Sequence, residues 1–253
     1  MLVAISIFVM IVATIATAAF VLAPQIGKGQ LIFDLRPDLP RPFGYRMAWL
    51  AIRTRDTHRV AECLGLAGTQ SANWDTGLGT IYSPGHAGDR LFVSPPVNGW
   101  TFVVGLALPL PLGRDHADKA TPLLLDLGAR FIEVQCYVSH PASDRYAWAR
   151  IIDGRLVRAF AIGKDGVLWK HGKPTKEEKT MGLKLFQVRG VRGKRDDMGS
   201  ELLMHPTEEH VMRLAAKWSL DPTRVDQVQV SASLGLIGHA PARWRPELLQ
   251  KVG

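Results

Sequence analysis

The longest apolar run of the chain lies at its N-terminus, where residues 2–23 contain no charged residue, glycine or proline. As a helix this run is about 33 Å long, which is enough to cross a hydrocarbon core of roughly 30 Å. A cleaved signal peptide is the competing interpretation, because Ala16-Thr17-Ala18 offers small residues to a signal peptidase. The length of the run, and the absence of Lys or Arg before it, favour a transmembrane anchor over residues 1–26.

The basic residues near this run predict its orientation. None precedes it, whereas Lys28, Arg36, Arg41 and Arg46 follow it. The positive-inside rule therefore places the rest of the chain in the cytoplasm, as the soluble part of a single-pass inner-membrane protein. A periplasmic or secreted domain is the alternative if the run is cleaved.

Prolines separate the apolar run from the first regular pattern. Residues 34–42 contain three prolines, which favours an extended linker over residues 27–44. The soluble domain is then expected over residues 45–253. Its first pattern is a buried strand at 45–53, followed by a short helix that Asp56 caps and that runs to Leu66.

Turn residues organise the next part of the chain. A loop is expected around Asn73, Trp74, Gly77 and Gly79, and strand-like runs at 90–94 and 99–105 flank Pro95-Pro-Val-Asn-Gly99, the composition of a hairpin. A helix at 118–127 and a strand at 131–138 follow.

The strongest local signal is Asp153-Gly154, which joins runs 145–152 and 155–162 into a hairpin. A turn at 164–166 adds a third strand at 167–170. Thr207 caps a later amphipathic helix, and the tail from Val230 is expected to wrap the surface.

These elements predict an α+β protein with a mainly antiparallel sheet and flanking helices. Each of the ranges 45–115 and 116–222 carries a helix before a hairpin, so the pattern also suggests two related halves. Identity between the halves is low, and duplication is an architectural hypothesis only.

The formal net charge of +8 arises mainly from one segment of the chain. Between Lys164 and Arg195 the chain has ten Lys or Arg against three acidic residues, so this segment carries nearly all of the excess. Few aromatic residues accompany these charges, which disfavours nucleic acid and leaves anionic lipid or plain solvation. The predicted basic patch consists of Lys170, Lys173, Lys176, Arg189, Arg192, Lys194 and Arg195.

No motif in the sequence indicates a reaction. The two cysteines, Cys63 and Cys136, lack the paired spacing of a zinc or redox site. His205 and His210 have no metalloprotease context, and Ser139-His140 would point to opposite faces of a strand. We therefore expect no metal and no cofactor, and we name no catalytic residue.

Large aromatic side chains beside Asn and Asp in turns are typical of recognition surfaces. Five residues fit this description, and we predict them as binding residues: Asn73, Trp74, Asp75, Asn98 and Trp100. The alternative is that both tryptophans fill the ends of a small sheet, as buried tryptophans commonly do.

Three stretches resemble a family of uncharacterised bacterial proteins, and the resemblance covers roughly residues 45–222. They are Met47–Arg53, Phe92–Gly105 and Trp148–Arg158. The resemblance implies an α+β fold but brings no activity, ligand or site residue.

Together these features favour a membrane-anchored, non-enzymatic binding protein with a protein partner, such as an immunity protein that neutralises a bacterial toxin. One alternative is an enzyme with a site assembled from scattered residues, with Trp74, Asp75, His140 and Arg158 as first candidates. The other is a membrane-associated protein that binds nucleic acid or anionic lipid through the basic segment.

Overall fold

The computed structural model describes residues 33–113, 115–164, 166–181 and 206–247, together with Met10, Thr14 and Thr17. The chain divides into two compact units, Met1–Phe33 and Asp34–Gly253. Among the described residues no helix has both the length and the hydropathy needed to cross a membrane. The predicted anchor at residues 2–23 lies almost wholly outside the described residues.

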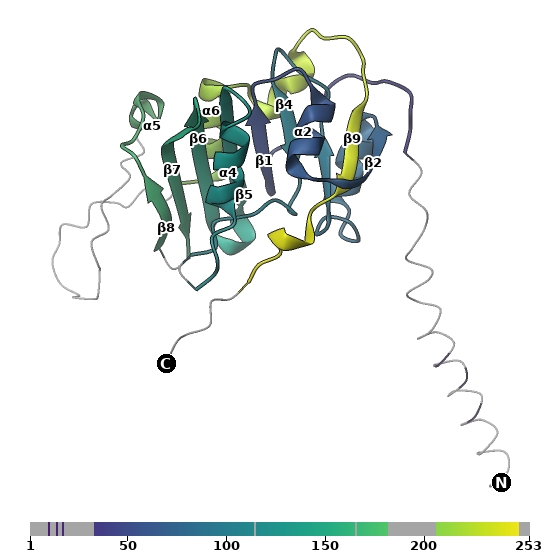
Figure 1. Cartoon of the computed structure of the whole chain (residues 1–253), viewed down its shortest axis with the longest axis horizontal. Coiled ribbons are helices and arrows are strands. Elements are labelled where there is room, and N and C mark those ends of the chain that lie inside the picture. Colours follow the sequence, from purple (N-terminus) through teal and green to yellow (C-terminus); the bar gives the residue numbers. More distant parts are fainter. Residues whose placement is uncertain are drawn as a thin grey trace. The chain divides into compact units, whose positions relative to one another are not determined.

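Within the described part of the second unit, nine strands form one antiparallel sheet in the order β2-β9-β3-β4-β1-β5-β6-β7-β8 (Figure 1). This confirms the predicted α+β class with a mainly antiparallel sheet. The strands are β1 (Met47–Ile52), β2 (Ala67–Ala72), β3 (Arg90–Val93), β4 (Thr101–Val104), β5 (Glu133–His140), β6 (Arg145–Ile152), β7 (Arg155–Gly163), β8 (Gly166–His171) and β9 (Gly235–His239). The helices are α2 (Thr57–Leu64), α3 (Trp74–Tyr82), α4 (Ala120–Gly128), α5 (Lys176–Thr180) and α6 (Glu208–Trp218), with short 3-10 helices at Pro141–Ser143 (η1), Pro222–Gln227 (η2) and Ala242–Trp244 (η3).

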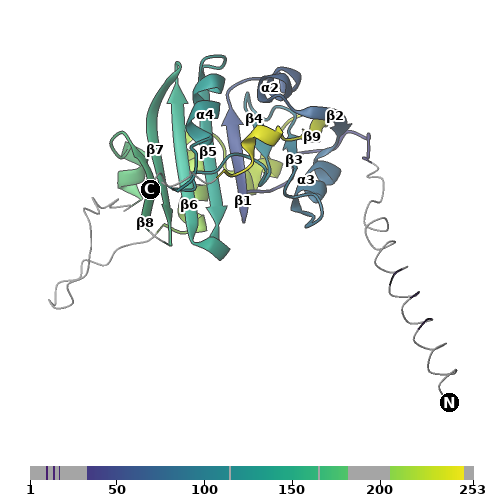
Figure 2. The ribbon, with the colours of Figure 1, turned by 60° about the horizontal axis from the view of Figure 1, so that its bottom comes forward.

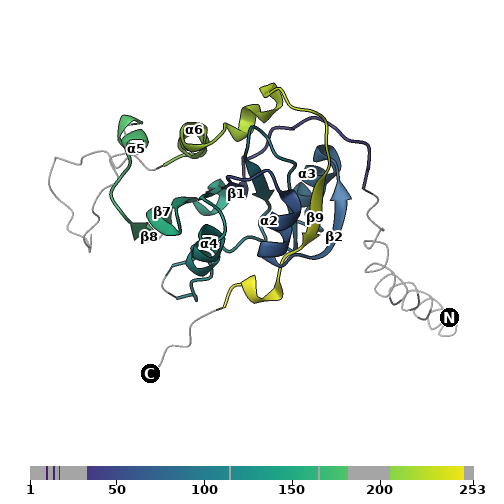
Figure 3. The ribbon, with the colours of Figure 1, turned by 45° about the horizontal axis from the view of Figure 1, so that its top comes forward.

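One face of the sheet packs against α2 and α4. Leu50 of β1 shares a buried cluster with Val60 and Leu64 of α2 and with Leu124 and Leu127 of α4. Figure 3 shows these two helices on the side of the sheet opposite to α5 and α6. Because successive strand residues point to opposite faces, the neighbours of Leu50 along β1 point to the other face of the sheet.

Aromatic side chains dominate that other face. Trp49, Tyr137, Trp148 and Phe160 are direct cross-strand partners on β1, β5, β6 and β7. The Trp49 and Tyr137 rings stack with centroids 5.0 Å apart, and the Trp148 and Phe160 centroids are 4.9 Å apart. Such pairs contribute beyond the area that they bury, so this row fixes the register of four strands. Trp218 of α6 covers Tyr137.

The segment predicted as a free linker is partly built into the fold. Asp38 pairs with Ser233 in a β-bridge, and its carboxylate accepts hydrogen bonds from the backbone N–H groups of Trp74 and Asp75 at 2.7 and 3.0 Å. Phe43 is 3% exposed and packs against Trp49 and Phe102. The predicted linker boundary at residue 44 is therefore wrong, and the folded unit begins at Asp34.

Two further expectations are corrected by the structure. The predicted loop around Trp74 and Gly77 is helix α3, and the preceding edge strand β2 was not predicted. The tail does not only wrap the surface, because Gly235–His239 forms β9 inside the sheet, between β2 and β3. Glycine is required at position 235, since a Cβ there would meet the carbonyl oxygen of Val93.

The two predicted halves meet at β1, which pairs with β4 on one side and with β5 on the other. Residues 45–115 and 116–222 thus contribute to one continuous sheet within one compact unit. Figure 2 shows the sheet passing through β1 and β5 without a break. Whether the halves are related by duplication stays a hypothesis.

Candidate functional site

The two tryptophans of the predicted recognition surface lie in the interior. Trp74 is the first residue of α3 and is 1% exposed, with its ring 5.4 Å from that of Phe92. Trp100 is 5% exposed and lies under the guanidinium group of Arg53, at 5.5 Å. Both rings therefore contribute to packing, and the expectation that Trp74 is presented on a loop is wrong.

The three polar residues of that prediction have different surroundings. Asn73 is buried and caps α3, because its side-chain oxygen accepts the backbone N–H of Thr76 at 3.0 Å. Asp75 and Asn98 are exposed, and Asp75 forms an ion pair with Arg41 at 3.1 Å. Of the five residues, only Asp75 and Asn98 present their side chains at the surface, and their role in binding stays a prediction.

The predicted basic patch is described in part. Lys170 lies on β8, Lys173 follows it, and Lys176 begins α5; all three are exposed. Arg189, Arg192, Lys194 and Arg195 lie outside the described residues.

The first candidates for a dispersed active site are not brought together. Arg158 lies on β7, whereas Trp74 and Asp75 begin the helix that packs on β3, five strands away in the sheet order. His140, at the end of β5, pairs with the hydroxyl of Ser143 at 2.9 Å. Within the described ranges no group of His, Cys, Asp and Glu side chains has the arrangement of a metal site.

A buried polar network lies between α6 and the sheet, and it was not predicted. The side-chain amide of Gln135 donates to the Glu133 carboxylate at 2.7 Å and to the carbonyl of Trp218 at 3.0 Å. The hydroxyl of Tyr137 donates to the Gln135 side chain at 2.7 Å, and burial raises the pKa of this tyrosine well above its ordinary value. Arg150 completes the network through Glu133 at 2.7 Å. These groups satisfy one another, so the network positions α6 on the sheet.

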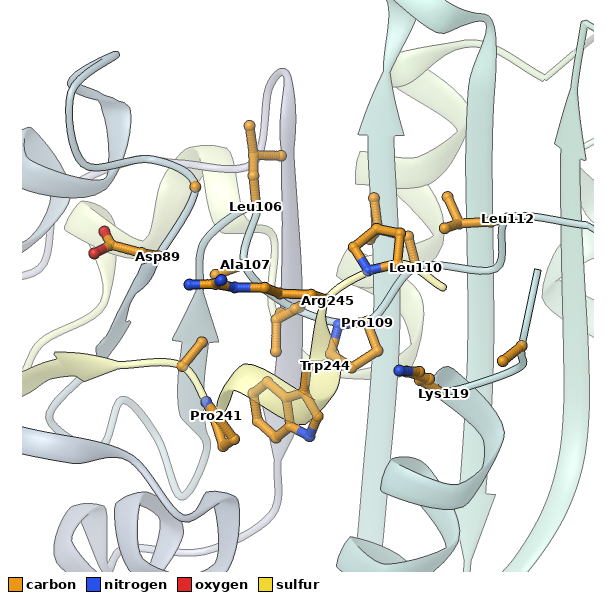
Figure 4. A pocket seen from close by; sticks show the side chains of 15 residues that line it. Asp89, Leu106, Ala107, Pro109, Leu110, Leu112, Lys119, Pro241, Trp244 and Arg245 are labelled. Carbon is orange, nitrogen blue, oxygen red and sulfur yellow. The ribbon is translucent and has the colours of Figure 1, made fainter. Parts of the chain in front are cut away.

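A concavity lies on the opposite face, where the C-terminal segment 240–247 crosses between α2 and α4 (Figure 4). We call this segment the strap. Beneath it is a depression of about 140 Å³ with an apolar lining, which we call the strap groove. Its apolar wall is formed by Leu106, Ala107, Leu108, Pro109, Leu110, Leu112, Pro241, Trp244 and Pro246.

Trp244 fixes the strap to the domain. Its ring is 8% exposed and belongs to the same buried cluster as α2 and α4. On either side of it, Ala240 donates its backbone N–H to the carbonyl of Asp89 at 2.8 Å, and Ala117 donates to the carbonyl of Glu247 at 3.0 Å. The strap is therefore held at both ends and at its centre.

Charged side chains surround the apolar floor. Lys119 forms an ion pair with Glu247 at 3.0 Å, and Asp89 contacts the His239 ring at 3.2 Å. Arg245 lines the groove, and Arg243 lines an adjoining depression of about 320 Å³ on the other side of Trp244. Both arginines are exposed, and neither has an ion-pair partner among the residues that the structure describes.

The size of the groove limits what it can hold. A cavity of about 150 Å³ accommodates one benzene-sized group, whereas pockets for drug-sized ligands usually exceed about 300 Å³. The strap groove therefore fits one apolar side chain of a partner better than a cofactor. An apolar centre with a charged rim is also the usual anatomy of a protein interface.

No protein-family model matches this chain, and no curated protein and no solved structure matches it either. The comparisons thus add no relative from which a function could be transferred, and the function has to be argued from the site itself.

Proposed function

We propose that this chain is a non-enzymatic binding protein that docks a protein partner at the strap groove. The observation that carries the proposal is the side-chain-sized apolar depression flanked by two arginines that form no ion pair with any other described residue. Arg is among the residues most enriched at positions that dominate binding energy, and here Arg243 and Arg245 are exposed on either side of the buried Trp244.

The chemistry of the rim indicates an acidic partner. Arg243 and Arg245 present guanidinium groups that form bidentate hydrogen bonds with carboxylates. The net charge of +8 would attract an acidic protein over longer distances and raise its association rate. The partner segment in this proposal carries one apolar side chain for the groove and carboxylates beside it.

The proposed setting is the inner membrane of a bacterium. Residues 2–23 would anchor the chain, and the basic residues after them would keep the domain in the cytoplasm. A domain tethered at this surface and built to bind one protein is suited to an immunity protein that neutralises a toxin by direct contact. This form of the proposal rests on the uncharged N-terminal run.

The test is co-expression with the product of the neighbouring gene in the native host. If that product inhibits growth, this chain should restore growth and co-elute with it as a complex. The double variant Arg243→Glu/Arg245→Glu should weaken the complex by about 100-fold or more, because it opposes two negative charges to the carboxylates of the partner at the rim of the groove.

Arg55→Glu is the matched control, because Arg55 is exposed and lies before α2, away from the groove. It makes the same type of charge change and should leave binding within about twofold, as expected for a charge outside the interface. An equal loss of partner binding in both variants would reject the strap groove as the binding site. A neighbouring product that is harmless and does not bind would reject the immunity function.

A further inference from the structure

Among the residues that the structure describes, β8 forms one edge of the sheet. It pairs with β7 on one side and is the last strand in the sheet order. Within the described part of the chain, Gly166–Lys170 make no hydrogen bond to any group outside β7. In an antiparallel edge strand, alternate residues direct their N–H and C=O groups away from the sheet, so β8 presents a row of unused backbone donors and acceptors.

Lysines line this edge and the helix that follows it. Lys170, Lys173, Lys176 and Lys179 are exposed, and none has an ion-pair partner among the described residues. The two carboxylates of α5 do not fully neutralise the charges of these lysines. Glu178 is buried on Arg158, and Glu177 is the single half-exposed carboxylate of α5.

A second depression lies beside the same strand. It has a volume of about 200 Å³, and Leu168 and Trp169 of β8 form one of its walls. The opposite wall comes from the segment 111–118, in which Pro111 and Leu112 are apolar and His116 and Asp118 are polar. A side chain from a strand added next to β8 would therefore find an apolar site within reach, since alternate residues of an added strand point to one face.

We propose that the edge of β8 binds an extended acidic segment of a protein by strand addition. The backbone groups of β8 would supply main-chain hydrogen bonds, the depression beside Trp169 would take one apolar side chain, and the lysines would select carboxylates. The depression shares Leu112 and Ala117 with the strap groove, whereas the edge of β8 and the lysines do not line that groove. The use of this edge does not depend on the proposed toxin partner.

The charges of the lysines indicate which kind of partner would bind at the edge of β8. A second copy of this chain would bring its own lysines, and like charges opposed across strands are destabilising. The lysines therefore prevent self-pairing at β8, whereas an acidic strand turns the same charges into attraction. An anionic membrane would be attracted too, but it would use neither the backbone edge nor the apolar depression.

The other edge of the sheet provides an internal comparison. Strand β2 contains no charged residue, and its pairing with β9 is interrupted between Ala67 and Gln70, where Gly68 has a φ of 58°. None of the depressions described above is lined by β2. The combination of lysines, free backbone and apolar depression thus distinguishes β8 from β2.

The test uses the full chain in neutral detergent micelles and a fluorescent peptide of about seven residues, the length of an ordinary strand, that alternates Glu with Val and one Phe. Fluorescence anisotropy should show saturable binding. A peptide of the same sequence with alternate N-methylated backbone amides should bind about tenfold more weakly or worse, because it cannot complete the ladder. Replacing Glu with Lys in the peptide should abolish binding.

Variants locate the binding on the molecule. Lys170→Glu/Lys173→Glu should weaken peptide binding by about tenfold, since both charges flank the edge. Lys217→Glu, an exposed lysine on α6, is the control and should bind normally. Arg243→Glu/Arg245→Glu should also bind the peptide normally, which separates this site from the strap groove.

Three results would overturn the proposal. Equal binding of the N-methylated peptide would show that no strand is added. Unchanged peptide binding by the Lys170→Glu/Lys173→Glu variant, with its melting temperature preserved, would place the site elsewhere. Binding of phosphatidylserine vesicles through these lysines, with no binding of the peptide, would assign the patch to lipid instead.

Discussion

The guanidinium group of Arg158 and the carboxylate of Glu178 form an ion pair that solvent does not reach. The shortest distance, Nη2 to Oε1, is 2.7 Å, and the two side chains are 1% and 0% exposed. Glu178 also accepts the indole N–H of Trp148 at 2.8 Å and the backbone N–H of Thr175 at 2.7 Å. Through these contacts the short helix α5 is fixed to β6 and β7, beside the edge strand β8.

We expect Glu178→Gln to lower the free energy of unfolding by about 3–5 kcal/mol, because it leaves the Arg158 charge buried without a counter-charge. The double variant Arg158→Met/Glu178→Leu should cost less than the sum of the single changes Arg158→Met and Glu178→Leu, since no uncompensated charge remains. Urea unfolding of the double variant and of these two single variants measures this coupling. Additive losses would mean that the two side chains do not depend on each other.

We expect Trp74→Ala and Trp148→Ala to destabilise the domain alike, by about 3–5 kcal/mol each, because both rings are buried and each would leave a cavity. Asp75→Ala removes only an exposed ion pair and should cost less than about 1 kcal/mol. Thermal unfolding provides the comparison. A Trp74→Ala protein of unchanged stability would show that its ring is free for recognition after all.

We expect removal of residues 1–26 to leave a folded domain, whereas removal of residues 1–44 should unfold it. The longer deletion takes away Phe43 from the aromatic cluster and Asp38 from the N-terminus of α3. Loss of a helix cap alone costs about 1 kcal/mol, and Asp38→Ala isolates this contribution. Circular dichroism of the two truncations provides the test. Equal stability of the two truncated proteins would show that residues 27–44 are a linker, as the sequence predicted.

We expect the two thiols to differ in reactivity. Cys63 is half-buried on α2, whereas Cys136 on β5 is buried, and burial raises the pKa of the Cys136 thiol to about 12. In the native protein near pH 8, iodoacetamide should alkylate Cys63 alone, since the thiolate is the reactive form. Mass spectrometry of the labelled peptides checks this, and rapid labelling of Cys136 would show that β5 opens locally.

The same pKa predicts a pH dependence of stability. Because Cys136 stays protonated in the folded state above its ordinary pKa of about 8.5, its contribution is complete below that pH. The contribution is then lost as the pH rises towards about 12. Between these values the wild type should lose stability faster than Cys136→Ala. Parallel pH profiles of stability for the wild type and Cys136→Ala would contradict the raised pKa of Cys136.

Local turn chemistry was sufficient to predict the second half of the sheet. Asp153 and Gly154 adopt φ values of 48° and 74°, the paired positive angles of the tight hairpin that their sequence predicts. Asp56 likewise caps α2 as expected. In these places the residues that decide the structure are neighbours in sequence.

The elements that escaped prediction depend on distant contacts. Helix α3 contains Gly77 and Gly79, which disfavour a helix, yet a Cβ at position 77 would overlap the ring of Phe92. Asp38 stabilises the start of this helix from 36 residues away. The strap groove could not be predicted for the same reason, because Trp244 acquires its role only when the tail lies between α2 and α4.

Strand β9 has a consequence for how the protein is made. Its residues, Gly235–His239, follow every other described strand in the chain, and until they leave the ribosome β2 and β3 lack the strand that lies between them. The nascent chain therefore has two unsatisfied strand edges until β9 has been translated. A message that ends before codon 235 would yield an aggregation-prone chain, which quality control removes, and not a smaller working domain.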